Sequence, residues 1–296
     1  MLRRLISIYR KYQLKKAEKA KAIERALFIK NGQVPWSPGY LEYRNEQIAK
    51  SISSPEILEI FKQGKVPEKF GYRLDERIVE YCWIFSQLTP QKKMRLLDAG
   101  STFNHEFILN NIDLSKVELS ILTYAPEHPN FNEKRVSYIY ADLRDIPLRD
   151  EYYDVVVSQS TIEHIDMDNS IYGYKMPYHQ DVTTKSYEYL KAVAEMLRVL
   201  KKGGKLLLTF PYGKYENHGF FQQFDEDMLN RILDLLHERG SYTTSFFRYL
   251  PEGWIACEKE DCREIESFNP HTGKGKGTDG AAHCRSICCI SFQKDK

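Results

Sequence analysis

Short apolar runs alternate with amphipathic segments along the middle of the chain, and this alternation predicts strands and helices in turn. Runs rich in apolar and β-branched residues predict buried strands over 94–99, 117–123, 136–140, 153–159 and 205–210. A helix is predicted over 187–200, where apolar residues recur on one face and Gly203 follows the last turn. This alternation predicts an α/β fold with a parallel sheet covered on both faces.

Further elements are expected on both sides of this region. Asp75 is the predicted N-cap of a helix over 74–88, and Asp225 is the predicted N-cap of a helix that ends near Leu236. Two more helices are expected over 40–51 and 55–63. Extended runs over 242–250 and 285–292 are expected to complete the sheet.

The first thirty residues form a predicted helix with a charge of its own. Ten lysines and arginines against two glutamates give residues 1–30 a net charge of +8, and because the whole chain carries +2, the remainder carries −6. The helix either lies on anionic lipid or docks on the body through an apolar stripe formed by Leu2, Leu5, Ile6 and Tyr9. The acidic remainder disfavours nucleic acid as a partner.

The composition is that of a packed globular protein, with 42% hydrophobic and 28% charged residues among 296. No apolar run approaches the roughly 18 residues that cross a bilayer, and residues 2–9 are too short and too charged at their flanks for a secretory signal. We therefore expect a cytoplasmic protein, with peripheral contact at the inner membrane face through the first helix. Its six cysteines are expected to be reduced thiols.

Polar and glycine residues gather directly after the predicted strands. In a parallel sheet the ligand lies beyond the carboxyl ends of the strands, so these positions are candidate binding residues. Gly100 and Ser101 follow the first strand, at the start of a helix whose free backbone N–H groups favour an anion. Other strand ends carry Asp142 with Leu143, the run 158–164, and the run 211–214.

Four of these segments resemble the successive motifs of class I S-adenosylmethionine-dependent methyltransferases. They read LLDAGS, ADLRDIPL, YYDVVVSQSTIEHI and AVAEMLRVLKKGGKLLLTFPYG, in matching order over residues 95–212. The methyltransferase type 11-like subgroup, with small-molecule acceptors, fits best. The resemblance implies a Rossmann-like sheet of seven strands whose last strand is antiparallel. FGYRLDERIVEYCWIFSQL and PYGKYENHGFFQQFD also resemble bacterial methyltransferases associated with surface glycan assembly.

The resemblance and the physical argument agree on the cofactor residues. Gly100 and Ser101 would hold the methionine carboxylate of S-adenosylmethionine, and the Asp142 side chain with the Leu143 backbone would hold the adenine. Asp98 either contacts the cofactor or only orients the turn. On this interpretation the chain consists of a basic amphipathic helix (1–30), a helical cap (31–90) and a class I methyltransferase domain (91–296).

The expected reaction is methyl transfer to a saccharide or small-molecule acceptor, at oxygen. Gln159 and Ser160 would flank the reacting sulfonium. An alcohol acceptor loses a proton, and His164, with Glu163 beside it, is the candidate base. Aromatic residues in the segments 36–43 and 212–224 are the candidate acceptor wall, because aromatic faces suit sugar rings.

Two positions depart from the family pattern. Thr102 stands where the family usually has a further glycine, which makes Asn104 and His105 candidate contacts in its place. The family's acidic residue at the end of the second strand is missing, and only Glu127, slightly later, could replace it. The alternative is therefore a catalytically inactive methyltransferase-like adaptor.

Other chemistries have weaker support in the sequence. A nucleotide-dependent oxidoreductase would need the G-x-G-x-x-G fingerprint after the first strand and an acidic residue after the second, and both are absent. Four residues separate Cys257 from Cys262, and three separate Cys284 from Cys288. Zinc sites favour C-x-x-C pairs, so no metal site is expected. The glycine-rich stretch 269–280 lacks P-loop spacing and predicts a flexible hairpin loop.

Overall fold

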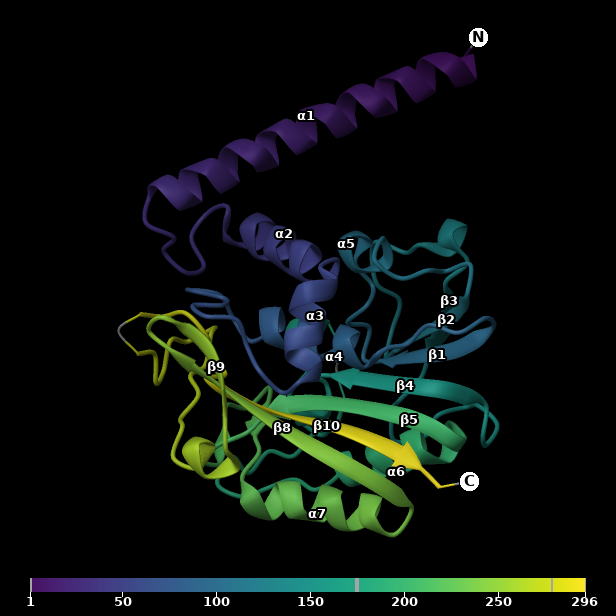
Figure 1. Ribbon diagram of the computed structural model, residues 1–296, viewed down its shortest axis with the longest axis vertical. Coiled ribbons are helices and arrows are strands. Elements are labelled where there is room, and N and C mark those ends of the chain that lie inside the picture. Colours follow the sequence, from purple (N-terminus) through teal and green to yellow (C-terminus); the bar gives the residue numbers. More distant parts are fainter. Residues whose placement is uncertain (1, 174–175, 278, 296) are drawn as a thin grey trace.

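The computed structural model of the protein describes residues 2–173, 176–277 and 279–295 (Figure 1). The helices are α1 (Leu2–Lys30), α2 (Tyr40–Ile52), α3 (Pro55–Lys62), α4 (Arg77–Gln87), α5 (Glu106–Leu109), α6 (Tyr189–Val199) and α7 (Glu226–His237). The strands are β1 (Met94–Ala99), β2 (Val117–Thr123), β3 (Ser137–Tyr140), β4 (Tyr153–Gln159), β5 (Leu200–Pro211), β6 (Glu216–Asn217), β7 (Gln222–Gln223), β8 (Gly240–Leu250), β9 (Gly253–Cys257) and β10 (Ser286–Lys294).

One large sheet of eight strands runs through the molecule in the order β3-β2-β1-β4-β5-β10-β8-β9. The first five strands in this order pair in parallel, whereas β10 pairs antiparallel with both β5 and β8. This confirms the predicted α/β fold and its antiparallel last strand. The expected count of seven strands was wrong, because β9 folds back on β8 as an additional antiparallel strand at the edge.

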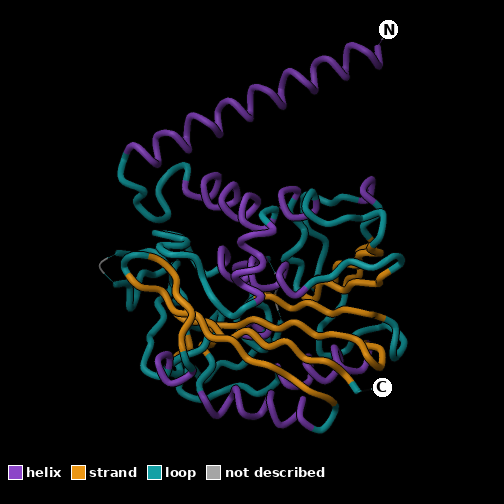
Figure 2. The backbone as a smooth tube through the Cα atoms, viewed as in Figure 1, coloured by secondary structure: helices purple, strands orange, loops and turns teal. Residues whose placement is uncertain are grey.

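Helices cover both faces of the sheet, as the tube in Figure 2 also shows. Alternate residues of a strand point to opposite faces, so Leu96 belongs to the core beneath α2, α3 and α4, and Leu97 to the core beneath α6 and α7. In β5, Leu207 faces the first of these cores, and its neighbours Leu206 and Leu208 face the second. Continuous apolar strands are therefore explained by burial on both sides.

The structure corrects two predicted boundaries. The helix predicted from Leu74 begins at Arg77, with Glu76 rather than Asp75 as its N-cap. Asp75 forms an ion pair with Arg44, whose Nη1 lies 2.6 Å from Asp75 Oδ2. Strand β5 begins at Leu200 because that residue pairs with Tyr153 of β4 before the two strands bulge. The Asp225 cap of α7 is confirmed, since its side chain accepts a hydrogen bond from the Met228 N–H at 3.2 Å.

Helix α1 projects away from the sheet and contacts the body near its C-terminal end (Figure 1). There Phe28 packs against Tyr40 and Tyr43, with ring centroids 5.9 and 5.3 Å apart, and Arg25 forms an ion pair with Glu46 at 2.9 Å. The side chains of the predicted stripe at Leu2, Leu5, Ile6 and Tyr9 lie outside the described residues. No described helix is long and apolar enough to cross a membrane.

Candidate active site

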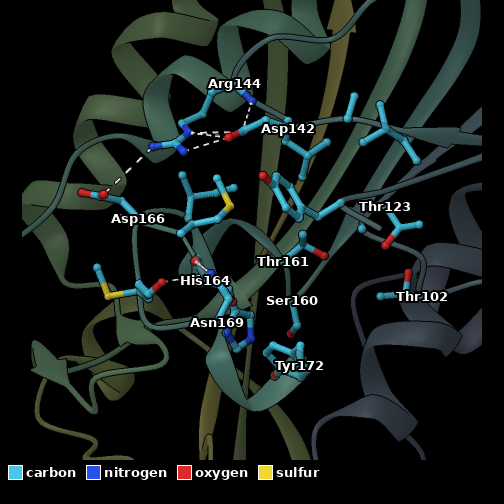
Figure 3. Close-up of a pocket in the computed structure, with 18 of the residues that line it drawn as sticks. Thr102, Thr123, Asp142, Arg144, Ser160, Thr161, His164, Asp166, Asn169 and Tyr172 are labelled. Carbon is cyan, nitrogen blue, oxygen red and sulfur yellow. Dashed lines mark hydrogen bonds and ion pairs between the residues drawn. The ribbon is translucent and has the colours of Figure 1, made fainter. Parts of the chain in front are cut away.

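The carboxyl ends of β1 to β4 surround a cavity of about 290 Å³, which we call the first cavity (Figure 3). Five of the residues assigned to the cofactor or to the base line it, and they come from the turns that follow β1, β3 and β4: Gly100, Asp142, Leu143, Ser160 and His164. Apolar side chains of Leu122, Ile165 and Met167 also line it. The sheet has therefore brought together residues that are far apart in the sequence.

The turn after β1 requires a glycine at one position. Gly100 has φ +131°, and a Cβ atom there would lie 2.0 Å from the Thr161 Oγ1 atom of the turn after β4. Ser101 and Ser160 also adopt positive φ values, 63° and 40°, which are uncommon for residues with a side chain. Backbone strain of this kind gathers at binding sites, where the surrounding structure enforces it.

Asp98 holds this turn together and does not line the first cavity. Its carboxylate accepts hydrogen bonds from the Phe103 N–H at 2.7 Å, the Thr102 N–H at 3.3 Å and the Thr102 hydroxyl at 3.1 Å. Burial raises the pKa of Asp98 to about 7, although these donors counteract the shift. Of the two roles considered for Asp98, the geometry favours orienting the turn.

Thr102 takes the place of the missing family glycine without closing the first cavity, which it lines. Its hydroxyl is turned back onto Asp98, and Tyr81 donates a hydrogen bond to its backbone oxygen. Asn104, a predicted replacement contact, is buried and donates to the Glu127 carboxylate and to the Pro129 carbonyl, at 3.3 and 3.2 Å. Asn104 thus helps to hold Glu127, which lines the first cavity.

Glu127 reaches the first cavity although it follows β2 by four residues. One carboxylate oxygen accepts from the Thr123 hydroxyl at 2.8 Å, and the other accepts from the Ser101 hydroxyl at 2.6 Å. The carboxylate is therefore fixed between the ends of β1 and β2. This is where the family pattern places an acidic side chain.

Asp142 lines the first cavity with its carboxylate engaged by Arg144 (Figure 3). Arg144 Nη2 lies 2.8 Å from Asp142 Oδ2, and the Arg144 N–H donates to Asp142 Oδ1 at 2.8 Å. Partial burial pushes the pKa of Asp142 upward, but these hydrogen bonds outweigh it and hold the pKa below its ordinary value. Asp142 is thus an anion, and its remaining lone pairs can accept further hydrogen bonds.

Gln159 and Ser160 separate in the structure. Ser160 lines the first cavity, and its hydroxyl donates to the buried carboxylate of Glu80. Gln159 is fully buried and points to the same carboxylate, with Nε2 3.5 Å from Glu80 Oε2. Glu80 also accepts from the Thr209 hydroxyl at 2.6 Å. Sequence reasoning missed Glu80, which ties α4 to the ends of β4 and β5.

A second cavity of about 430 Å³ adjoins the first, and we call it the second cavity. Arg77, His164 and Tyr172 line both of them and therefore form their common wall. Both segments expected to form an acceptor wall contribute to the second cavity, through Trp36 and through Phe220 with its neighbour Phe221. Arg77 was not anticipated, because a charged residue in the first turn of a helix ordinarily faces solvent.

Trp36 fixes the N-terminal extension over the second cavity. Its indole Nε1–H donates to the Gly280 and Ala281 carbonyls, at 3.0 and 3.2 Å. Tyr212, by contrast, is fully buried and packs against Phe246, with ring centroids 5.2 Å apart. The acceptor contact considered for Tyr212 is therefore not supported.

His164 is held with one ring nitrogen free. Its Nδ1 lies 2.7 Å from the Phe220 carbonyl oxygen, so Nδ1 carries the hydrogen and Nε2 a lone pair. Burial lowers the pKa of His164 to about 4. The positive charge of Arg77 also lowers this pKa, whereas the hydrogen bond to the Phe220 carbonyl raises it. Glu163 Oε1 lies 4.0 Å from His164 Nε2, and burial raises the pKa of Glu163 to about 8. Near neutral pH, His164 is an uncharged base beside a largely protonated carboxyl.

The terminal cysteines do not gather into one cluster. Cys257 and Cys262 lie together, with their sulfur atoms 3.4 Å apart, whereas Cys288 and Cys289 are buried in the sheet on opposite faces of β10. Cys284 lines the second cavity instead. The sequence spacing of 284 and 288 therefore does not correspond to a shared site.

Comparison with protein families identifies the middle of the chain. Residues 104–208 match the family described as "Methyltransferase domain". The protein is similar to methyltransferase domains over these residues. It is an enzyme of the S-adenosylmethionine-dependent class, and S-adenosylmethionine is its cofactor. The match begins at Asn104, directly after the glycine turn, and ends within β5.

Solved structures with a similar fold include other methyltransferases. The 1,6-didemethyltoxoflavin-N1-methyltransferase of Burkholderia thailandensis, crystallised with 1,6-didemethyltoxoflavin and S-adenosylhomocysteine, is 12% identical, with 69% of this chain and 72% of that chain covered and a TM-score of 0.40. An S-adenosylmethionine-dependent methyltransferase of Thermotoga maritima is 14% identical, with 84% and 99% covered and a TM-score of 0.40. The comparison with curated proteins gave no match. None of these similarities identifies the acceptor of the reaction.

Proposed function

We propose that the protein transfers a methyl group from S-adenosylmethionine in the first cavity to a hydroxyl of a saccharide or other small molecule in the second cavity. The observation that carries this proposal is the common wall of Arg77, His164 and Tyr172 between the two cavities. Methyl transfer is an in-line displacement, so the donor and acceptor must meet at one boundary in a fixed geometry. A pair of adjoining cavities meets that requirement.

The first cavity has a group for each part of the cofactor. The backbone turn at Gly100 and Ser101 would bind the methionine carboxylate, and the Glu127 carboxylate would accept hydrogen bonds from the ribose hydroxyls. Asp142 would accept a hydrogen bond from the adenine amine, while Leu143 offers its backbone and an apolar contact to the ring. These roles are supported by the position of all but Ser101 on the wall of the first cavity. Ser101 supports the wall through its bond to Glu127.

His164 is the proposed base of the reaction. As the acceptor oxygen attacks the methyl carbon, the C–O bond forms, the C–S bond breaks and S-adenosylhomocysteine is released. The hydroxyl proton passes to His164 Nε2, because Nδ1 already donates to the Phe220 carbonyl. The resulting imidazolium lies near Glu163, whose ionisation would then be favoured by the new positive charge.

The lining of the second cavity supports a saccharide acceptor. The aromatic faces of Trp36, Phe220, Phe221 and Phe268 offer stacking surfaces for a sugar ring, and the charged side chain of Arg44 offers a hydrogen-bond donor to hydroxyl or phosphate oxygens. The similarity of two segments to methyltransferases associated with surface glycan assembly points the same way. Acceptors of this kind include nucleotide sugars and lipid-linked glycans made on the cytoplasmic side of a membrane.

The first helix supports a peripheral membrane contact. Most of α1 extends beyond the body (Figure 1), and residues 1–30 carry a net charge of +8. Each lysine or arginine near an anionic surface contributes roughly 1 kcal/mol of attraction. We infer that α1 lies on anionic lipid and brings the two cavities to a membrane-borne acceptor.

The test is turnover by a variant at His164. Purified protein is incubated with S-adenosylmethionine and a panel of nucleotide sugars, and S-adenosylhomocysteine is quantified. His164→Ala is expected to bind S-adenosylhomocysteine normally and to turn over roughly 10²- to 10⁴-fold more slowly. His237→Ala, at the exposed end of α7, is the matched control and should behave as wild type. Full turnover by His164→Ala would remove the base assignment.

A further inference from the structure

Three potential metal ligands meet in the second cavity from two distant parts of the chain. Glu76 directly precedes α4, whereas His283 and Cys284 lie shortly before β10, which begins at Ser286. Their ligand atoms all lie within 4.8 Å of one another, and all three residues line the second cavity. His283 Nε2 lies 3.2 Å from Glu76 Oε1. The sequence spacing of the cysteines could not reveal this cluster, because it requires α4 and β10 to pack together.

The polar atoms of this cluster are only partly satisfied. Glu76 is 1% exposed, and its Oε2 atom has no hydrogen-bond partner among the described residues, nor has His283 Nδ1. A buried polar atom without a partner lowers the free energy of unfolding by about 1 to 3 kcal/mol, and a bound ligand would remove this penalty. A cation bound between these side chains would give the Glu76 Oε2 atom a partner.

The Glu76 carboxylate also lacks a cationic partner, unlike its neighbours. Two neighbouring carboxylates are paired with guanidinium groups: Asp75 with Arg44 at 2.6 Å and Glu80 with Arg77 at 2.9 Å. Within the described part of the chain, Glu76 has no ion pair with a lysine or arginine. Buried carboxylates are stable as anions only when paired or bound to a metal. Because Asp75 and Glu80 are already paired, Glu76 is the carboxylate available to bind a metal ion.

We propose that Glu76, His283 and Cys284 bind one Zn²⁺ ion in the second cavity. A carboxylate, an imidazole and a thiolate together suit zinc, whereas magnesium and calcium prefer oxygen alone. Tetrahedral zinc with bonds of about 2.0 to 2.3 Å places its ligand atoms roughly 3.3 to 3.7 Å apart. The ligand atoms now lie within 4.8 Å of one another, so zinc binding would draw them closer together.

Three protein ligands leave one position of a tetrahedral ion open, which is the pattern of catalytic rather than structural zinc. The second cavity provides room for a fourth ligand. Resting on the proposed function, we infer that this ligand is an oxygen of the acceptor, which the ion would fix beside His164 and make more acidic. The metal would thereby select acceptors that carry a hydroxyl able to coordinate zinc.

The experiment measures zinc binding by the full-length protein without cofactor or acceptor. Metal is removed with a chelator, and Zn²⁺ is titrated in competition with a chromophoric indicator. Wild type is expected to bind one tight equivalent. Cys284→Ser and Glu76→Gln are expected to weaken binding by more than about 100-fold, since even outer-shell changes cost 10- to 100-fold. Cys257→Ser is the matched control and should bind as wild type.

Cobalt supplies a second readout that depends on the thiol. Co²⁺ in the site should give near-ultraviolet charge-transfer absorption from the thiolate, retained in Cys257→Ser and lost in Cys284→Ser. Circular dichroism of each variant verifies that it has folded, and a variant that fails is replaced by His283→Gln. No tight zinc equivalent in wild type would overturn the site, as would binding that Cys257→Ser abolishes and Cys284→Ser leaves intact. Zinc binding without cofactor binding would uphold the metal site and refute methyl transfer.

Discussion

At the scale of single residues, we propose that Glu127 compensates for both departures from the family pattern. It supplies the carboxylate missing at the end of β2, and it accepts a hydrogen bond from Ser101 in a turn that has Thr102 instead of a further glycine. The Thr123 hydroxyl and the Asn104 amide fix its direction. A carboxylate four residues beyond the end of β2 can therefore occupy the position expected for one at the strand end.

Replacement of this carboxylate should weaken cofactor binding. Glu127→Gln keeps the shape but exchanges charge-assisted hydrogen bonds to the ribose for neutral ones. A hydrogen bond to a charged group contributes roughly 1 kcal/mol more than a neutral one. The Kd for S-adenosylhomocysteine should therefore rise about fivefold for each such bond. Calorimetric titration measures it, with the exposed Glu133→Gln as control. An unchanged Kd for Glu127→Gln would show that the ribose is bound elsewhere.

The buried Asp98 should make stability depend on pH. Its pKa is about 7 in the folded protein and about 3.9 in an unfolded chain, so between these values the folded state holds a proton that the unfolded state has lost. This contribution is fully present below about pH 4 and is lost as pH rises to about 7, by up to about 1.4 kcal/mol per pH unit.

Comparison with Asp98→Asn isolates that contribution from other titrating groups. Urea unfolding of both proteins is measured across this pH range. The unfolding free energy of wild type minus that of Asp98→Asn should fall from about pH 4 to about pH 7 and stay constant above about pH 8. A difference independent of pH would mean that Asp98 ionises normally in the folded protein.

Residues at strand ends could be predicted from the sequence, and those elsewhere in the site could not. Gly100, Asp142 and Ser160 follow strands, and parallel strands bring their carboxyl ends to one edge. Arg77 lies in α4, well before β1, and Tyr172 lies in the loop between β4 and α6. The direction of each side chain therefore depends on how α4 and this loop pack. A tertiary arrangement of this kind leaves no periodic signal in the sequence.

At the scale of elements, burial on both faces decides what the sequence can predict. Strands β1, β2 and β4 match the predicted ranges at both ends, because their continuous apolar runs are bounded by turn residues. Strand β9 was missed because GWIAC is short, lies at the sheet edge and follows a tight turn after β8. The start of α4 was misplaced because Asp75, a good N-cap by residue type, is used in the ion pair with Arg44.

Helix α1 should be removable in large part without harm to the body. Residues 1–20 hold seven of the ten basic residues of the first thirty, while the body contacts at Arg25 and Phe28 lie beyond them. Deletion of 1–20 should leave the melting temperature and S-adenosylhomocysteine binding unchanged. Sedimentation with phosphatidylglycerol vesicles should fall to the level seen with phosphatidylcholine. Equal sedimentation of both proteins with anionic vesicles would contradict the membrane role of α1.

At the scale of the whole molecule, the sheet and the N-terminal helices together build the proposed donor site next to the proposed acceptor site. The parallel half of the sheet provides the first cavity, whereas the second cavity also needs Trp36 and Arg44 from the N-terminal segments and residues from the loop before β10. On the proposed function, the extension is therefore part of the catalytic unit. Its contacts with Gly280 and Ala281 join two stretches of chain more than 200 residues apart.

The most direct test of this account is calorimetric titration of the full-length protein with S-adenosylhomocysteine. We predict one site in wild type, a Kd at least about tenfold weaker in Asp142→Ala, where a hydrogen bond to a charged group is lost, and wild-type affinity in the exposed control Asp145→Ala. Absence of binding in wild type would show that Thr102 or the Asp142–Arg144 pair closes the first cavity, and the protein would then be an inactive adaptor. Equal binding by Asp142→Ala would place the cofactor outside the first cavity.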